Sequence, residues 1–115
     1  MKAIFVTGAA SGIGRATSLL FARRGFKVGC YDVDVEGVRR VADEIVAAAG
    51  KDACCHGRID VTNEEAWSAA LADFESQAHR MDILFNCAGI MRTGHFQYVT
   101  PAECRRQLDV NVMGV

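Results

Sequence analysis

The apolar residues of this chain form two kinds of stretch that alternate along its whole length. Four short and mostly apolar runs are typical of buried strands, the third having the weakest pattern: residues 3–6, 26–31, 53–59 and 83–86. Each of the first three runs is followed by a stretch in which apolar residues recur at helical spacing, and the fourth by a loop and the start of a further helix. Alternating strands and helices predict a parallel sheet covered on both faces, with right-handed crossovers, which is an α/β fold of the doubly wound kind.

Three of the expected helices have an apolar face that can pack on the sheet. The first presents Ile13, Ala16, Leu19 and Leu20. The second presents Val35, Val38, Ala42, Ile45, Val46 and Ala49. The third presents Ala66, Trp67, Ala70, Leu71 and Phe74. Gly25 stands where a left-handed cap is expected after the first helix, and Gly50 closes the second.

Two capping boxes are expected to begin the third and fourth helices. Thr62 and Glu65 form the first of these patterns, and Thr100 and Glu103 form the second. Residues 111–115 carry no cap or polar finish, so we expect the chain to be cut inside the fourth helix. The fourth strand of a doubly wound sheet is normally interior, so we expect an unprotected apolar edge there and poor solubility.

Length and composition predict one soluble domain. The chain has 115 residues, of which half are hydrophobic, and this content is sufficient for a single core. Its 13 basic and 14 acidic residues form no block of one sign, so no nucleic-acid or anionic-membrane partner is expected. No signal-peptide pattern or membrane-length apolar stretch is present, which favours the cytoplasm.

The five cysteines are expected to be reduced thiols, because they are scattered and form no C-x-x-C pair. Cys54, Cys55 and His56 are adjacent, but neighbours on one strand point to opposite faces and no second ligand pair follows. We therefore expect no metal site. Cys87 is interpreted as a small buried residue rather than a nucleophile.

A glycine-rich turn joins the first strand to the first helix and is the main candidate for a binding site. It contains Gly8, Ser11, Gly12, Ile13 and Gly14. Glycines there allow a tight turn and a close approach to a pyrophosphate at the helix N-terminus, although they are also compatible with a purely structural turn.

Asp32, at the end of the second strand, favours a dinucleotide. Its carboxylate can accept hydrogen bonds from the adenosine ribose hydroxyls, whereas a ribose phosphate at that place would meet like charge. NAD is therefore favoured over NADP, and neither Ser11 nor Val33 supplies a cation for a second phosphate. One alternative stays open: Asp32 could cap the next helix, although Asp34 is at least as well placed to do so. Arg15 is near the turn, but its place in the first helical turn favours a surface role.

The Thr-Gly-x-x-x-Gly-Ile-Gly spacing of residues 7–14 resembles the fingerprint of classical short-chain dehydrogenases/reductases. Three further segments match the family in the same order: Asp60-Val61, Asn86-Cys87-Ala88-Gly89, where cysteine replaces an asparagine, and Asn111. The resemblance covers the whole chain. It implies that residues 1–115 are the NAD(P)-binding, Rossmann-type N-terminal half of such an enzyme, with about four strands and four helices.

The resemblance also implies roles for individual residues. The implied cofactor-binding set is Gly8, Ser11, Gly12, Ile13, Gly14, Asp32, Asp60, Val61, Asn86, Ala88 and Gly89. Asp60 and Val61 would contact the adenine ring, and residues 86–89 would line the nicotinamide side. Asn111 would belong to the catalytic set by ordering a water in a proton relay. Structural alternatives are a helix cap for Asp60, an ordinary turn for residues 86–89, and a buried amide bonded to backbone for Asn111.

The implied reaction of the complete protein is hydride transfer between a nicotinamide cofactor and a small alcohol or carbonyl substrate, in a homo-oligomer. The family's catalytic serine and Tyr-x-x-x-Lys motif are absent, since neither Tyr31 nor Tyr98 has a lysine four residues later, so this chain alone is expected to be inactive. Two other functions remain open: a non-catalytic nucleotide-binding regulatory or interaction protein, and an S-adenosylmethionine-dependent methyltransferase. A P-loop phosphotransferase is disfavoured, because no Gly-Lys-Ser/Thr follows the turn.

Overall fold

The computed structural model describes residues 1–91 and 93–115 and has four parallel strands in one sheet, in the order β3-β2-β1-β4. The strands are β1 (Ala3–Thr7), β2 (Lys27–Asp32), β3 (Cys54–Arg58) and β4 (Ile83–Asn86). The α-helices are α1 (Gly12–Arg23), α2 (Val35–Ala49), α3 (Glu64–Ala78) and α4 (Pro101–Leu108). Short helical turns are η1 (Lys51–Ala53), η2 (Phe96–Tyr98) and the π-helical η3 (Asp109–Met113), which continues α4. The predicted α/β fold with a parallel sheet is confirmed.

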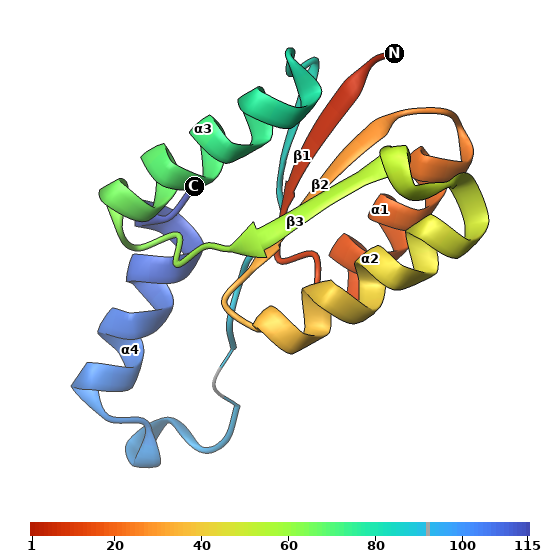
Figure 1. The fold of residues 1–115 in the computed structure, drawn as a ribbon. Helices are drawn as coiled ribbons and strands as arrows, with labels where there is room; N and C mark the ends of the chain where they lie inside the picture. Colours follow the sequence, from red (N-terminus) through yellow and green to blue (C-terminus); the bar gives the residue numbers. More distant parts are fainter. Residues whose placement is uncertain (92) are drawn as a thin grey trace.

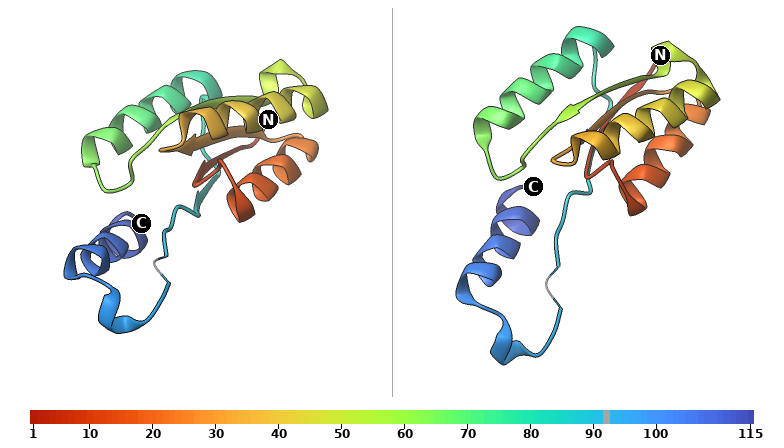
Figure 2. Two further views of the ribbon diagram at one scale, coloured as in Figure 1. Left: turned by 90° about the horizontal axis from the view of Figure 1, so that it is seen from below. Right: turned by 60° about the horizontal axis from the view of Figure 1, so that its bottom comes forward.

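The sheet separates two apolar layers (Figures 1 and 2). Helices α1 and α2 cover one face, where Ile4 and Val6 of β1 meet buried side chains such as Ile45. Helix α3 covers the other face, where Phe5 packs between Tyr31 and Phe74. All five residues of β1 are buried, as expected for a strand covered on both sides.

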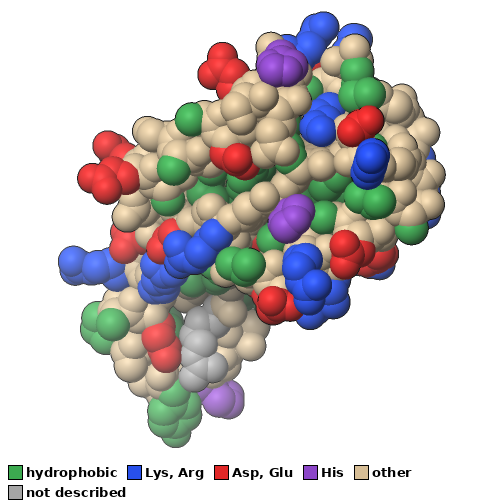
Figure 3. All heavy atoms as spheres, in the orientation of Figure 1, with side chains coloured by type: hydrophobic (Ala, Val, Ile, Leu, Met, Phe, Trp, Pro, Cys, Tyr) green, Lys and Arg blue, Asp and Glu red, His purple; other side chains and the backbone are tan. Residues whose placement is uncertain are grey.

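Helix α4 lies apart from these layers, beyond the carboxyl ends of the strands, and a long segment after β4 leads to it (Figure 1). Its η3 continuation returns to the body of the protein, where Val110 joins the core beside Val61. Charged side chains of both signs are mixed over the face shown in Figure 3. In the part of the chain that is described, no helix is long and apolar enough to cross a membrane.

The packed faces of α1 and α2 differ from those predicted. Ile13, Ala16 and Leu20 of α1 are exposed, and Leu19 packs against the core as predicted. The helix buries Gly14, Ser18 and Ala22. Such small side chains let a helix lie close to its neighbours, and the Ser18 hydroxyl is satisfied by donating to the Gly14 carbonyl.

On α2 the buried face is rotated from the predicted one. Val35, Val46 and Ala49 are exposed, whereas Val41 is fully buried and was not predicted. The reason is geometric: Val38, Val41, Ala42 and Ile45 form the buried stripe, whereas Val35 and Val46, eleven residues apart and therefore on the same side of the helix, lie beyond one edge of it.

The expected helix ends are only partly confirmed. Thr100 and Glu103 form the predicted capping box of α4, and Gly25 and Gly50 both have positive φ after their helices. The capping box at Thr62 is wrong, because Asn63 is the N-cap of α3 and its side chain accepts from the Ala66 N–H. The Thr62 hydroxyl donates instead to Asp60.

Strand β4 is an edge of the described sheet, as expected. It pairs only with β1 among the strands that the structure describes, and Leu84 is 44% exposed. An apolar strand with one unpaired side is a site for association with other chains. The expected poor solubility stays a prediction.

Two adjacent residues of α2 test the corrected helix face. Ile45 is 0% exposed and Val46 is 39% exposed. We predict that Ile45→Ala lowers the free energy of unfolding by about 2–5 kcal/mol, because it leaves a cavity in the core. Val46→Ala should cost less than about 1 kcal/mol. Urea unfolding followed by circular dichroism measures both, and equal losses would contradict the packing described.

Candidate functional site

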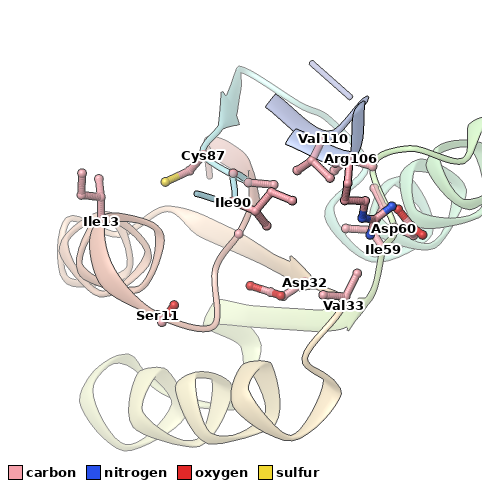
Figure 4. Close-up of a pocket in the computed structure, with 14 residues that line it drawn as sticks. Ser11, Ile13, Asp32, Val33, Ile59, Asp60, Cys87, Ile90, Arg106 and Val110 are labelled. Atoms are coloured by element: carbon pink, nitrogen blue, oxygen red, sulfur yellow. The ribbon is translucent and has the colours of Figure 1, made fainter. Parts of the chain in front are cut away.

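A cavity of about 380 Å³ lies at the carboxyl ends of β1, β2 and β4 (Figure 4). Its walls come from the turn after β1, the ends of β2 and β3, the segment after β4, and helix α4 with η3. The lining residues are Gly8, Ser11, Ile13, Asp32, Val33, Ile59, Asp60, Val61, Cys87, Ala88, Gly89, Ile90, Arg106 and Val110. Crevices outside the carboxyl ends of parallel strands are the usual ligand sites of open α/β sheets.

The glycine-rich turn brings the backbone against both the cavity and β4. Gly8 and Gly12 have left-handed φ values of 68° and 56°, which side chains rarely adopt. A Cβ at Gly8 would lie only 2.8 Å from the backbone N and Cα of Ala88. A Cβ at Gly14 would collide with the Gly8 carbonyl. The glycines thus bring the N-terminus of α1, with its unbonded N–H groups, to the cavity wall.

Asp32 is held rigidly at the end of β2. One carboxylate oxygen accepts from the Ala10 N–H and the other from the Asp34 N–H, each at 3.0 Å. Asp34 is the N-cap of α2, since its carboxylate accepts from Gly37, so the alternative that Asp32 caps this helix is wrong. Asp32 therefore lies at the cavity with its position fixed by the glycine-rich turn (Figure 4).

Asp60 is the second carboxylate of the cavity. Its Oδ1 accepts from both the hydroxyl and the backbone N–H of Thr62, and these two bonds hold the pKa of the carboxyl below its usual value. The charge of Arg106 on α4 acts in the same direction. Because Asn63 caps α3, a capping role for Asp60 is wrong.

Thr7 was not among the predicted site residues, yet it holds one wall in place. Its hydroxyl oxygen accepts from the N–H groups of Cys87 and Ala88, both at 3.1 Å, and its side chain is almost fully buried. These bonds fasten the end of β1 to the segment after β4. The signal in the sequence was the position of Thr7 immediately before Gly8, at the end of a buried strand.

Asn111 connects η3 to the segment after β4 without lining the cavity. Its Oδ1 accepts from the Ile90 N–H and its Nδ2 donates to the Ile90 carbonyl, both at 2.8 Å. The side-chain amide thus bonds to backbone, as one alternative held, although the residue is exposed rather than buried.

The structure gathers most of the predicted cofactor-binding residues around one cavity. Gly12, Gly14 and Asn86 do not line it: the two glycines shape the turn, and Asn86 lies opposite Thr7 in the β1–β4 pairing. Sequence reasoning missed six lining residues: Val33, Ile59, Cys87, Ile90, Arg106 and Val110. Four of them adjoin predicted residues, whereas Arg106 and Val110 reach the cavity only because α4 and η3 return to it.

Other candidates lie elsewhere. Arg15 forms an ion pair with Glu44 on the surface, which confirms its surface role. Residues 1–91 and 93–115 contain no group of three His, Cys, Asp or Glu side chains placed to hold a metal ion. All five cysteines are free, with Cys87 half-buried at the cavity.

Comparisons with known proteins agree on one family. The profile of the short chain dehydrogenase family matches residues 2–115. Cyclohexanol dehydrogenase of Acinetobacter sp. is 35% identical over 115 residues, covering 99% of this chain and 45% of that protein. Cyclopentanol dehydrogenase of Comamonas testosteroni is 34% identical over 114 residues, again covering 99% of this chain and 45% of that protein.

Solved structures give the same result. A 3-ketoacyl-(acyl-carrier-protein) reductase from Brucella melitensis, complexed with NADH, superimposes with a TM-score of 0.88 at 34% identity. A short-chain type dehydrogenase/reductase from Mycobacterium marinum gives 0.91 at 30% identity. Each comparison covers 98% of this chain and 45% of the other. The chain thus spans about half the length of the relatives that it matches.

The two bonds accepted by Thr7 can be tested by substitution. Thr7→Val removes the acceptor of two N–H groups at a buried position, and we predict a loss of about 1–3 kcal/mol in the free energy of unfolding. Thr7→Ser keeps the hydroxyl oxygen and is the matched control, expected to be clearly more stable than the valine variant. Urea unfolding measures the difference, and a valine variant as stable as the serine variant would contradict this role.

Proposed function

The chain belongs to the short-chain dehydrogenase/reductase family, and we propose that its cavity binds NAD(H) for hydride transfer with an alcohol or carbonyl compound. The observation that carries the proposal is the order of groups along the cavity wall. The N-terminus of α1, the fixed carboxylate of Asp32 and an apolar surface around Val33 and Ile59 follow one another (Figure 4). This sequence of groups matches a pyrophosphate, a ribose diol and an adenine ring.

The pyrophosphate is proposed to lie against the turn before α1. The first N–H groups of a helix have no acceptor within it, and the helix dipole favours negative charge there. The tight turn at Gly8 and Gly12 keeps this end of the helix free of side-chain bulk. Ser11, the N-cap, makes no side-chain capping bond, so its hydroxyl can also donate to a phosphate oxygen.

Asp32 supports NAD rather than NADP. Its two oxygens each accept one backbone N–H and retain lone pairs for the ribose hydroxyls. A ribose phosphate would face this carboxylate, and Arg15, the cation of the first helical turn, is already paired with Glu44. We therefore propose NAD as the cofactor of this chain.

The nicotinamide half is proposed to lie toward the segment after β4. When bound, the cofactor supplies the hydride chemistry, and the protein residues position it and exclude water. Thr7 and Asn111 each bond the backbone of this segment and hold Ala88, Gly89 and Ile90 in place. The Asn111 amide retains one hydrogen and one lone pair, which can order a water as a proton relay requires.

We propose that residues 1–115 are the cofactor-binding domain of this enzyme and are inactive by themselves. The family's proton transfer needs a catalytic serine together with a Tyr-x-x-x-Lys motif, and neither Tyr31 nor Tyr98 has a lysine four residues later. Small alcohols or ketones are the proposed substrate class, since two similar proteins are named as dehydrogenases of cyclic alcohols. Assembly as a homo-oligomer is part of the same proposal.

Asp32 provides the test. We predict that Asp32→Ala weakens NADH binding about 10- to 100-fold, the effect of losing charged hydrogen bonds to the ribose, and reduces the preference over NADPH. Asp34→Ser is the matched control, because serine can still cap α2 and residue 34 does not line the cavity. Titration of nicotinamide fluorescence measures the dissociation constants, with circular dichroism confirming that each variant is folded.

Two outcomes would contradict the proposal. One is a protein that binds neither NADH nor NADPH. The other is an Asp32→Ala variant that binds NADH as well as the control does. S-adenosylmethionine is included as a competitor, and tight binding of that compound would favour a methyltransferase instead.

A further inference from the structure

Helix α4 brings a single cation to the cavity. Among the lining residues that the structure describes, Arg106 is the one Lys or Arg, and the ionised groups facing the same space are Asp32 and Asp60. Figure 4 shows the Arg106 side chain beside Asp60 and Ile59, on the opposite side of Asp32 from Ile13. Arg106 thus lies at the end of the cavity remote from the N-terminus of α1.

The Arg106 guanidinium is close to a carboxylate but is not bonded to it. Its charge contributes to the lowered pKa of Asp60, yet no ion pair or side-chain hydrogen bond joins it to any of residues 1–91 and 93–115. Thr62 occupies Oδ1 of Asp60. The guanidinium is therefore free to take a ligand between α4 and the end of β3.

The surface beneath this guanidinium is apolar. Ile59, Val61 and Val110 are all buried core residues that also line the cavity. A flat ligand can bury one face of its ring against these side chains, and its second face then remains exposed to solvent. A planar guanidinium over that second face would cover it, because arginine stacks on aromatic rings more readily than lysine does.

We propose that Arg106 stacks on the adenine ring of the cofactor and thereby makes α4 part of the cofactor site. The proposal rests on the proposed function: with the pyrophosphate at α1 and the ribose at Asp32, the base extends toward Ile59, Asp60 and Arg106. The ligand group recognised is a neutral purine ring rather than a phosphate, since the phosphates lie at the other end of the cavity.

A structural consequence follows for α4. The described structure joins α4 and η3 to the rest of the protein at few points, notably the Asn111 bonds to Ile90 and the packing of Val110. A base held between Arg106 and the sheet edge adds a contact from α4 to β3. Binding of adenosine should therefore slow backbone opening in residues 101–113.

The test compares adenosine, AMP and nicotinamide mononucleotide binding to the purified protein by calorimetry. Arg106→Ala should raise the dissociation constants of adenosine and AMP by a similar factor of about 3- to 30-fold. The dissociation constant of nicotinamide mononucleotide should not change. Arg106→Lys, which keeps the charge but loses the planar group, should fall between the wild type and the alanine variant. Arg105→Ala is the matched control, because Arg105 is exposed on the same helix and does not line the cavity.

Hydrogen exchange provides a second readout. AMP should protect residues 101–113 in the wild type and in Arg105→Ala, and should protect them much less in Arg106→Ala. An Arg106→Ala variant with unchanged adenosine affinity overturns the inference while leaving the proposed function standing. A variant that loses affinity for AMP but not for adenosine also overturns the inference, since Arg106 would then bind the phosphate rather than the base. A wild-type protein that binds neither NADH nor AMP overturns both.

Discussion

The close contact between the ends of β1 and β4 is the constraint on which the rest of the site depends. Thr7 accepts two N–H groups from the segment after β4, and Gly8 lies so near Ala88 that a Cβ would not fit. This contact turns the chain sharply before α1 and directs the segment after β4 away from the sheet. The space left between these two diverging segments is one end of the cavity, so the shape of that end follows from backbone packing.

The charges around the cavity are arranged along its length. The N-terminus of α1 supplies positive partial charge at one end, Asp32 lies in the middle, and Asp60 with Arg106 lies at the other end. Asp32 is fixed by two backbone N–H groups and Asp60 by Thr62, so both carboxylates are oriented before any ligand binds. Such preorganisation lowers the entropic cost of binding. It favours a ligand whose charges and hydrogen-bonding groups are complementary to those along the cavity.

The sequence predicted the strands, the parallel sheet and much of the site, because these depend on local patterns. Strand runs, turn glycines and the capping box at Thr100 are short-range features, and each was confirmed. Helix faces were harder, since Val41 and Val46 have the same hydrophobicity and only packing decides which is buried. Asn63, rather than the predicted Thr62, is the N-cap of α3, because the Thr62 hydroxyl is hydrogen-bonded to Asp60. Arg106 could not be predicted, because its place depends on how α4 returns to β3.

An amide NMR titration of the protein with NADH and, separately, with S-adenosylmethionine would identify the ligand of this cavity. NADH should shift signals of residues 8–13, 32–33, 60–61 and 88–90, which surround the cavity, and leave those of the outer face of α3 unchanged. S-adenosylmethionine shares only the adenosine part of NADH, so it should bind more weakly and leave the signals of residues 88–90 in place. Shifts with S-adenosylmethionine alone, or NADH shifts clustered away from these four segments, would contradict the claim that this cavity is a nicotinamide-dinucleotide site.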